Sequence, residues 1–289
     1  ALVAARKWIW AAAVVLVLMG FGWVRLQTGS YGAPVKVGMV VIPEAEQRKE
    51  AGLLGRYSME IQRLAAEGAR VVVLPEKVLT VTDTTRNSMY DSLAQMAGKL
   101  KIGIVAGVTG RFSAGLKNLA PVFGQQGQLL ADYEKVHLFE GEMYEGFGHG
   151  SKPGIFGDAG VAICKDLDFE SYMRNYGRAG IGVLYAPAWD FVRDGWWHSR
   201  IAIVGAVANG YSLVRNPRAG RMTISDDRGR VSFEASSEGL GGTRMTGTVR
   251  PARGHTLYSR LGDWFDWLMA AAAVSSLVYL AASRSFTRV

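Results

Sequence analysis

Two long runs without a charged side chain lie at opposite ends of the sequence, and they constrain its folding more than any other feature. The first extends from Trp8 to Val24 and the second from Trp267 to Ser283. A helix needs about 20 mostly apolar residues to cross the hydrocarbon core of a bilayer. We therefore expect transmembrane segments within residues 1–26 and 263–289, and a single domain of residues 27–262 between them.

Basic residues on the outer flanks of these runs predict the orientation of the chain. Arg6 and Lys7 precede the first run, and Arg284 follows the second. Because positive flanks stay in the cytoplasm, the domain between the runs is expected on the extracytoplasmic face. A cleaved signal peptide is the alternative for the first run, although no small-residue cleavage pattern follows it. The chain opens with Ala1 rather than Met, so we expect that residues upstream are missing.

Charge and cysteine usage exclude several classes of protein. The formal net charge of +8 comes from Lys and Arg residues that are dispersed along the chain. This dispersion argues against nucleic-acid binding and favours a solvated surface, or one that faces anionic lipid. A single Cys excludes an intrachain disulfide and a Cys-rich zinc site, and the four His have no paired spacing. We expect neither a metal nor a cofactor.

Short β-like stretches alternate with helical ones between the two runs, which is typical of a layered α/β domain. Apolar periodicity and turn residues define the individual elements. The predicted strands are 35–42, 69–74, 102–108, 116–123, 128–133, 161–163, 182–185, 212–215, 221–225 and 230–234. The predicted helices are 44–67, 87–100, 169–178 and 196–209.

Three reactive side chains follow predicted strands directly, namely Glu76, Lys135 and Cys164. Ligand crevices form at strand ends in layered α/β folds, so these side chains can converge on one site. A thiol needs a base or a nearby positive charge to attack a carbonyl, and Glu76 and Lys135 would supply them. The backbone N–H of Lys165 would help Lys135 to hold the negative oxygen of a tetrahedral intermediate. Taken singly, each has a plainer interpretation, as a surface Glu or Lys or a buried Cys.

The phrases VVVLPE, DYEKVHL and VAICKDLDF, which contain these residues, resemble the three catalytic motifs of the nitrilase, or carbon–nitrogen hydrolase, superfamily. The resemblance implies an αββα sandwich. It also implies a general base at Glu76, an oxyanion-stabilising lysine at Lys135 and a nucleophile at Cys164. Glu142 is similar to a second glutamate of the family, which supports the lysine.

Within that superfamily, the flanking apolar runs are similar to those of the bacterial apolipoprotein N-acyltransferases. This resemblance implies a domain on the periplasmic face of the inner membrane, a phospholipid acyl donor and the N-terminal amine of a lipoprotein as acceptor. Those enzymes carry a multi-helix bundle before the domain, of which Trp8–Val24 would be the last helix. The sequence departs from them at Gly205 and Ala208, where relatives have Arg and Glu.

Two other functions stay open at this point. A membrane-anchored amidase would give the same acyl-enzyme to water, and a catalytically idle nitrilase-like domain would act as a scaffold. An apolar groove leading to Cys164 would favour acyl transfer, whereas a small, polar, closed pocket would favour hydrolysis.

Other polar and aromatic residues have more ordinary interpretations. We expect turn or capping roles for Asp166 and Asp168 and a structural hydrogen bond for His137. Aromatic residues after the strand at 182–185 would form a lipid-facing rim or simply pack against the core. The candidate substrate-binding residues are Trp189, Asp190, Trp196 and His198.

Overall fold

Apolar segments of the chain form two β-sheets that pack face to face. The computed structural model describes residues 2–43, 52–191, 193–238 and 241–286. One sheet has the order β14-β1-β2-β4-β6-β5-β3, with β7 paired to β6, and the other has the order β13-β12-β11-β10-β9-β8. The strands of the first sheet are β1 (Val35–Val41), β2 (Val71–Val73), β3 (Leu79–Thr82), β4 (Gly103–Val105), β5 (Val108–Phe112), β6 (Gly115–Phe123), β7 (Leu129–Glu134) and β14 (Thr243–Val249). Those of the second are β8 (Gly154–Phe156), β9 (Ala159–Val161), β10 (Val183–Ala188), β11 (Ser212–Pro217), β12 (Arg221–Ser225) and β13 (Val231–Ser236).

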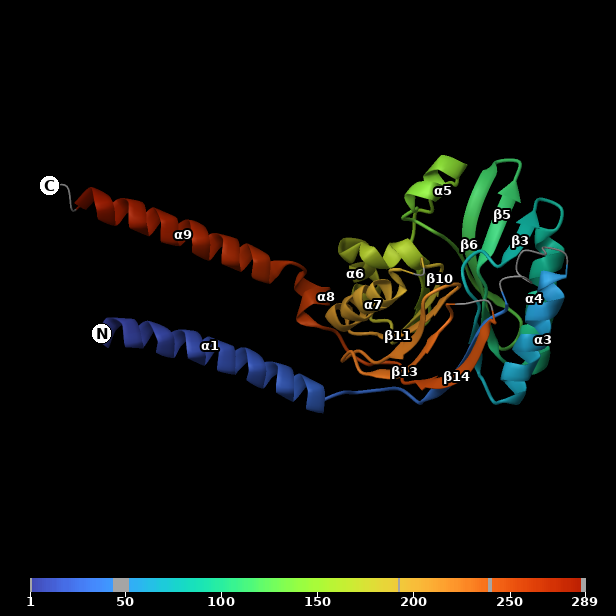
Figure 1. Cartoon of the computed structure of the whole chain (residues 1–289), viewed down its shortest axis with the longest axis horizontal. Coiled ribbons are helices and arrows are strands. Elements are labelled where there is room, and N and C mark those ends of the chain that lie inside the picture. The colour runs from blue at the N-terminus through green and yellow to red at the C-terminus, as the bar shows by residue number, and fades with distance from the viewer. Residues whose placement is uncertain (1, 44–51, 192, 239–240, 287–289) are drawn as a thin grey trace.

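Helices cover the outer face of each sheet, which gives four layers (Figure 1). α3 (Leu53–Ala66) and α4 (Arg86–Leu100) pack on the first sheet, and α6 (Glu170–Ala179) and α7 (Gly195–Asn209) on the second. Amphipathic spacing explains this arrangement, because the buried residues of α3 recur every three or four positions along one face. They are Leu53, Tyr57, Ile61 and Leu64. A separate apolar core fills the space between the two sheets. The layered α/β class expected from the sequence is confirmed.

The structure differs from the expected elements at a few places. The strand expected at 102–108 ends early, as β4, and a separate strand, β5, begins only at Val108, because the chain between them contacts the segment that carries Glu76. A Cβ at Gly107 would lie 2.0 Å from the Pro75 carbonyl oxygen, so only glycine fits there. β3, β8, β14 and the short helices α5 (Glu140–Glu145) and α8 (Leu257–Leu261) were not predicted. The first part of the helix expected at 44–67 lies outside the described residues.

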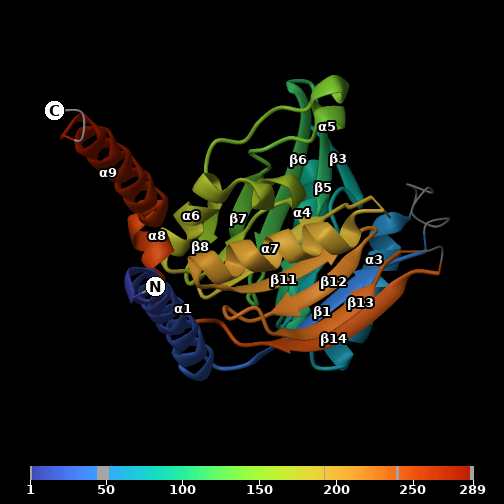
Figure 2. The same ribbon diagram turned by 60° about the vertical axis from the view of Figure 1, so that its left-hand side comes forward.

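The two ends of the domain meet in one sheet, because β1 pairs with β14 in antiparallel register, with Val35 opposite Val249. As a result, α1 (Leu2–Gln27) and α9 (Trp264–Phe286) leave the domain on the same side (Figures 1 and 2). In α1, residues Trp8–Gln27 are long and apolar enough to cross a membrane, and none is buried by the domain. The apolar part of α9, Trp264–Tyr279, is shorter. Membrane insertion at both ends therefore stays a prediction, as do the domain boundaries.

Candidate active site

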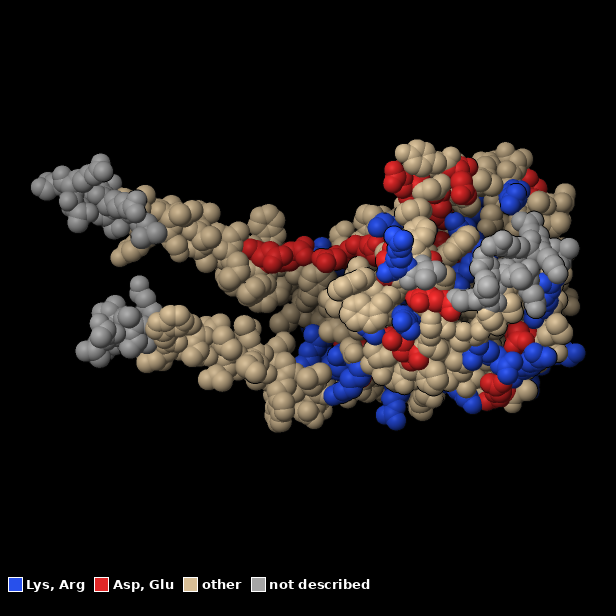
Figure 3. Space-filling model, viewed as in Figure 1, with Lys and Arg blue, Asp and Glu red and all other residues tan. Residues whose placement is uncertain are grey.

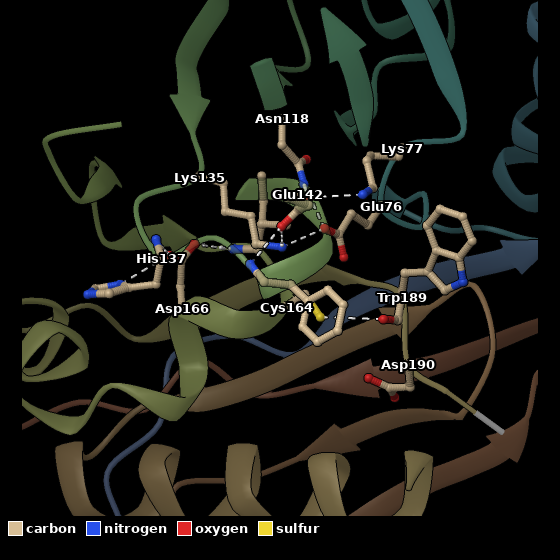
Figure 4. A network of polar contacts seen from close by, with 12 residues as sticks. Glu76, Lys77, Asn118, Lys135, His137, Glu142, Cys164, Asp166, Trp189 and Asp190 are labelled. Atoms are coloured by element: carbon tan, nitrogen blue, oxygen red, sulfur yellow. Dashed lines mark hydrogen bonds and ion pairs between the residues drawn. The ribbon is translucent and has the colours of Figure 1, made fainter. Parts of the chain in front are cut away.

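Strand ends from both sheets deliver the three predicted residues to one cavity of about 280 Å³ (Figure 4). Glu76 follows β2, and its backbone N–H donates to the Ala188 carbonyl of β10 at 3.2 Å. Lys135 follows β7, and Cys164 begins the 3₁₀-helix η1 (Cys164–Asp168) after β9. The geometry thus brings together a carboxylate, an ammonium and a thiol from separate parts of the sequence.

Two carboxylates share the ammonium group of Lys135 on the floor of the cavity. Lys135 Nζ lies 2.8 Å from Glu76 Oε1 and 2.7 Å from Glu142 Oε2. Asn118 Nδ2 donates to both carboxylates, at 2.6 Å in each case. Each of these side chains is at most 2% exposed, so the network is shielded from water. Among the described atoms, Glu76 Oε2 is buried without a hydrogen-bond partner, which leaves it free to accept a proton.

The electrostatics of this network fix the charge of Lys135 and Glu142. Burial opposes the charge of Lys135, but the carboxylates of Glu76 and Glu142 outweigh it and raise the lysine pKa above its usual range. Burial likewise disfavours the Glu142 carboxylate, yet Lys135 and Lys77 outweigh it and lower the pKa of Glu142 to about 2. Both groups are therefore charged near neutral pH.

The thiol of Cys164 lies in a constrained turn at the edge of the cavity. Its backbone has a φ of +43°, in the left-handed region that costs a non-glycine residue about 1–3 kcal/mol. Sγ donates to the Trp189 carbonyl at 3.6 Å. Burial, followed by the negative charge of Glu76, raises the cysteine pKa above its usual range despite Lys135 and Arg215. The resting group is thus a thiol, which must lose its proton during attack.

Asp166 ties the cysteine turn to the segment that follows β7. Its Oδ2 accepts from the Ile163 backbone N–H at 2.9 Å and from the Tyr133 hydroxyl at 2.7 Å. Its Oδ1 accepts from the His137 backbone N–H at 2.7 Å. The His137 ring stacks on Phe169 with centroids 3.7 Å apart. Asp166 is fully buried, and its contacts are those of a residue that positions two loops.

Three of the four candidate substrate-binding residues line the cavity, and Trp196 lies outside its lining. Trp189 provides the carbonyl beside Cys164 and is 41% exposed. Asp190 is buried in an ion pair with Arg215, at 2.6 Å between Oδ2 and Nη1. The pKa of His198 is raised, mainly by Asp168, whose Oδ1 lies 3.9 Å from His198 Nδ1. Trp196 instead packs edge-on against Trp197.

Asn118 and Lys77, two polar residues of the network around Lys135, were not singled out from the sequence. Asn118 lies in β6 and is fully buried, but in the sequence it directly follows Lys117 and is not distinguished from a surface residue. Lys77 has a φ of +53° and donates to Glu142 Oε1 at 3.0 Å. Its ammonium also lies 5.2 Å from the centre of the Trp189 ring. Among the described residues, no group of three or more His, Cys, Asp and Glu side chains is placed to hold a metal ion.

Comparisons with known sequences identify relatives that cover most of the chain. The family model for carbon-nitrogen hydrolases matches residues 36–287. An apolipoprotein N-acyltransferase of Geobacter metallireducens is 24% identical over 92% of this chain and 58% of its own length. A 2-oxoglutaramate amidase of Bacillus subtilis is 30% identical over 59% of this chain and 75% of its own length. The chain thus spans less than two thirds of the acyltransferase.

Solved structures share the fold at lower sequence identity. An amidase from Nesterenkonia sp. superposes with a TM-score of 0.64 at 16% identity, over 77% of this chain and 93% of the amidase. Nit3 of Saccharomyces cerevisiae, a member of branch 10 of the nitrilase superfamily, gives a TM-score of 0.63 at 23% identity, over 78% of this chain and 93% of Nit3. The αββα arrangement implied by the sequence motifs is therefore confirmed.

Proposed function

Because the chain belongs to the carbon-nitrogen hydrolase family, we propose that it is a membrane-bound N-acyltransferase with Cys164 as its nucleophile. In this proposal an acyl chain moves from a phospholipid to the N-terminal amine of a lipoprotein. One observation carries it: the cavity that holds Cys164 belongs to the same chain as α1, whose 20-residue apolar span is not covered by the domain. Exposed apolar surface of this extent is stable in lipid rather than in water.

In the first half-reaction, Cys164 Sγ attacks the ester carbonyl of the phospholipid while the Glu76 carboxylate takes the thiol proton. The C–S bond forms, and the carbonyl oxygen becomes an oxyanion. Lys135 and the backbone N–H of Lys165, which has no partner within η1, hold that charge. The ester C–O bond then breaks, and the lysophospholipid hydroxyl leaves with the proton from Glu76. A thioester remains on Cys164.

In the second half-reaction, the amine of the acceptor attacks the thioester carbonyl. Glu76 accepts the amine proton, the C–S bond breaks, and the thiolate of Cys164 recovers a proton from Glu76. The products are an amide and the free enzyme. Because donor and acceptor use the same cavity in turn, the kinetics are expected to be ping-pong.

The mouth of the cavity supports a donor with a long acyl chain. Its 280 Å³ lies just below the range of about 300–1,000 Å³ for ligand sites, so it holds the reacting carbonyl rather than a whole lipid. Phe139, Trp189 and Phe191 line it and are 40–55% exposed. The Phe139 and Phe191 rings lie 5.4 Å apart. The acyl chain would continue across this aromatic rim.

A hydrolase is the second candidate, because amidases are among the relatives in sequence and in fold. The same acyl-enzyme would then be released by water instead of an amine. The small cavity with a charged floor also suits a short amide substrate. The organised Lys135 network argues against the third candidate, an idle scaffold, since a purely structural domain has no need for a buried cluster of charges around a thiol.

An experiment that follows acylation of Cys164 and the later transfer of its acyl group distinguishes these candidates. The full chain, in bilayers that contain a phospholipid with an alkyne-tagged acyl chain, should acquire a hydroxylamine-sensitive label on Cys164. Addition of a diacylglyceryl peptide with a free N-terminal amine should move the tag to that peptide. The Cys164→Ala chain is the control and should stay unlabelled.

The other outcomes assign the other functions. No label from phospholipid, together with ammonia release from 2-oxoglutaramate, would replace the transferase with the amidase. If the protein is folded but shows neither activity, the scaffold function would be the remaining candidate. Under the proposal, the chain resides in the bacterial inner membrane with its catalytic domain on the periplasmic face.

A further inference from the structure

A second and larger cavity, of about 550 Å³, lies where α1 ends and α9 begins. Its walls come from both helices, from α6 and α7, and from α8 (Leu257–Leu261). Phe21, Trp264 and Phe265 line its outer part and are 39–57% exposed. The apolar span of α1 ends at Gln27 and that of α9 begins at Trp264. If the helices enter a bilayer, this cavity therefore lies at the level of the lipid headgroups.

The side of the cavity at the foot of α1 is basic. Arg25 Nη2 donates to the Val207 carbonyl at 2.7 Å, and Arg228 Nη2 donates to the Thr28 carbonyl at 2.7 Å. Arg228 also pairs with Asp227 at 2.9 Å. A guanidinium has five N–H donors in a planar fork, so these contacts leave donors available. Such forks bind phosphate oxygens in pairs.

The side of the cavity at the foot of α9 is acidic. Glu170, Asp263 and Asp266 contribute its carboxylates, of which Asp263 Oδ2 also lies 3.4 Å from Arg174 Nη1. Figure 3 shows the same division on the surface, with Lys and Arg gathered at the foot of α1 and Asp and Glu at the foot of α9. An anionic headgroup alone would be repelled by this second wall. A headgroup that carries both a phosphate and an ammonium matches both walls.

We propose that this junction cavity binds the headgroup of a phospholipid that bears a phosphate and a primary ammonium group. Arg25 and Arg228 hold the phosphate, the carboxylates of Asp263 and Asp266 face the ammonium, and the acyl chains run between α1 and α9. The site rests on the proposal that both helices lie in a bilayer. It is separate from the cavity of Cys164, so the lipid held here is a resident ligand and not the acyl donor.

The arginines of the junction cavity also attach α1 to the domain. A third arginine allows this attachment to be separated experimentally from lipid binding. Arg230 also donates to a carbonyl at the end of α1, that of Leu26. Arg230 lines a different cavity, with Tyr31 and Thr248. Arg230→Gln therefore removes a comparable helix contact and leaves the charges of the junction cavity intact, so it is the matched control for Arg228→Gln.

Lipid retention by the full chain tests the proposal. The Cys164→Ala chain, which cannot consume a donor, is placed in nanodiscs of phosphatidylethanolamine and phosphatidylglycerol in equal amounts. It is then extracted into mild detergent, and its bound lipid is counted by native mass spectrometry. We expect retained phosphatidylethanolamine to exceed phosphatidylglycerol. Arg25→Gln and Arg228→Gln should each lower retention about tenfold, as expected for loss of one charge-assisted contact.

Three further results decide the assignment. Asp266→Asn should reduce the preference for phosphatidylethanolamine without lowering the retention of phosphatidylglycerol, and Arg230→Gln should retain lipid like the parent chain. The assignment would be wrong if Arg230→Gln lost as much bound lipid as Arg228→Gln, or if Arg25→Gln lost none. Tighter retention of phosphatidylglycerol by the parent chain would also overturn it. Failure of Cys164 to form a thioester would refute the proposed activity and leave this lipid site untouched.

Discussion

At the scale of single residues, the thiol of Cys164 shares its cavity with the linked carboxylates of Glu76 and Glu142 and the ammonium groups of Lys77 and Lys135. Glu142 is neutralised by Lys135 and Lys77, and Glu76 lies 2.8 Å from Lys135. Transfer of the thiol proton to Glu76 therefore creates a thiolate next to a lysine that keeps its charge. This charge arrangement explains how a thiol with a raised pKa can still act as a nucleophile.

Asn118 is predicted to position both carboxylates. The Asn118→Ala variant should lower kcat by about 100-fold, because misplacement of a reacting group by about 1 Å costs that much. KM should change little, since Asn118 does not line the cavity. The assay is single-turnover acylation of Cys164. As a control, Asn175→Ala removes an exposed side chain–backbone hydrogen bond and should acylate at the rate of the parent. An equal loss of rate in Asn175→Ala would contradict a specific positioning role for Asn118.

Glu142 is predicted to make the folded state sensitive to acid. Its pKa is lowered from 4.5 to about 2, so its contribution is complete above pH 4.5 and is lost as the pH falls towards 2. This linkage corresponds to about 3 kcal/mol of the free energy of unfolding. When chemical unfolding is measured across that pH range, the free energy of unfolding should fall less with pH for Glu142→Gln than for the parent. The exposed Glu140→Gln control should follow the parent curve, and an unchanged slope in Glu142→Gln would contradict the assignment.

The sequence predicts those site residues that follow a recognisable strand. Glu76, Lys135 and Cys164 each follow a short apolar strand, and strand ends meet at one edge, so their convergence was predictable. Their catalytic roles stay predictions. Asn118 could not be found in this way, because its two partners lie far away in the sequence and its own strand has no distinguishing pattern. Lys77 was missed because its role depends on a left-handed turn.

At the scale of elements, the end of β7 is held by the loop that contains Gly150. The Gly150 N–H donates to the Lys135 carbonyl at 2.8 Å, and a Cβ at Gly150 would lie 2.1 Å from the Glu134 carbonyl oxygen. The loop and the strand end can therefore stay in contact only with glycine at this position. The geometry of Lys135 thus depends on a residue that does not enter the cavity.

Gly150→Ala is accordingly predicted to move Lys135 and to reduce acylation of Cys164 by at least tenfold, with a lower melting temperature. Gly205 has open space around it in α7, so Gly205→Ala should keep full activity and raise helix stability by about 0.5–1 kcal/mol. Both variants can be compared by thermal unfolding and by the thioester assay. Normal acylation by Gly150→Ala would show that the loop does not position the lysine.

Element prediction succeeded where local signals determine the structure, as in α6, whose buried residues share one face, and in α7, which ends at Gly210. It failed where a tertiary contact interrupts a pattern. The apolar run at 102–108 reads as a single strand, yet its backbone turns at Gly107 to contact Pro75. β14 (TRMTGTV) was not predicted, because its alternation is weak, with only Met245 and Val249 as large apolar residues and Gly247 between them, and it is held in place by pairing with β1.

At the scale of the whole molecule, the proposed orientation predicts which face of the membrane carries the domain. A Ser92→Cys reporter on exposed α4, in the Cys164→Ala chain, should react with a membrane-impermeant maleimide in intact spheroplasts. A cysteine appended after Val289 should react only after lysis, because both flanks are expected in the cytoplasm. The reverse pattern would place the domain in the cytoplasm and exclude a periplasmic acyl acceptor.

The pairing of β1 with β14 also has a consequence for synthesis of the protein. β1 emerges from the ribosome among the first parts of the domain, but its outer edge stays uncovered until Thr243–Val249 has been made. Nascent or truncated chains that stop before β14 therefore expose an unpaired apolar strand edge, which is a template for aggregation. The first sheet closes only after Val249 has been made, so the domain should fold late and depend on chaperones until then.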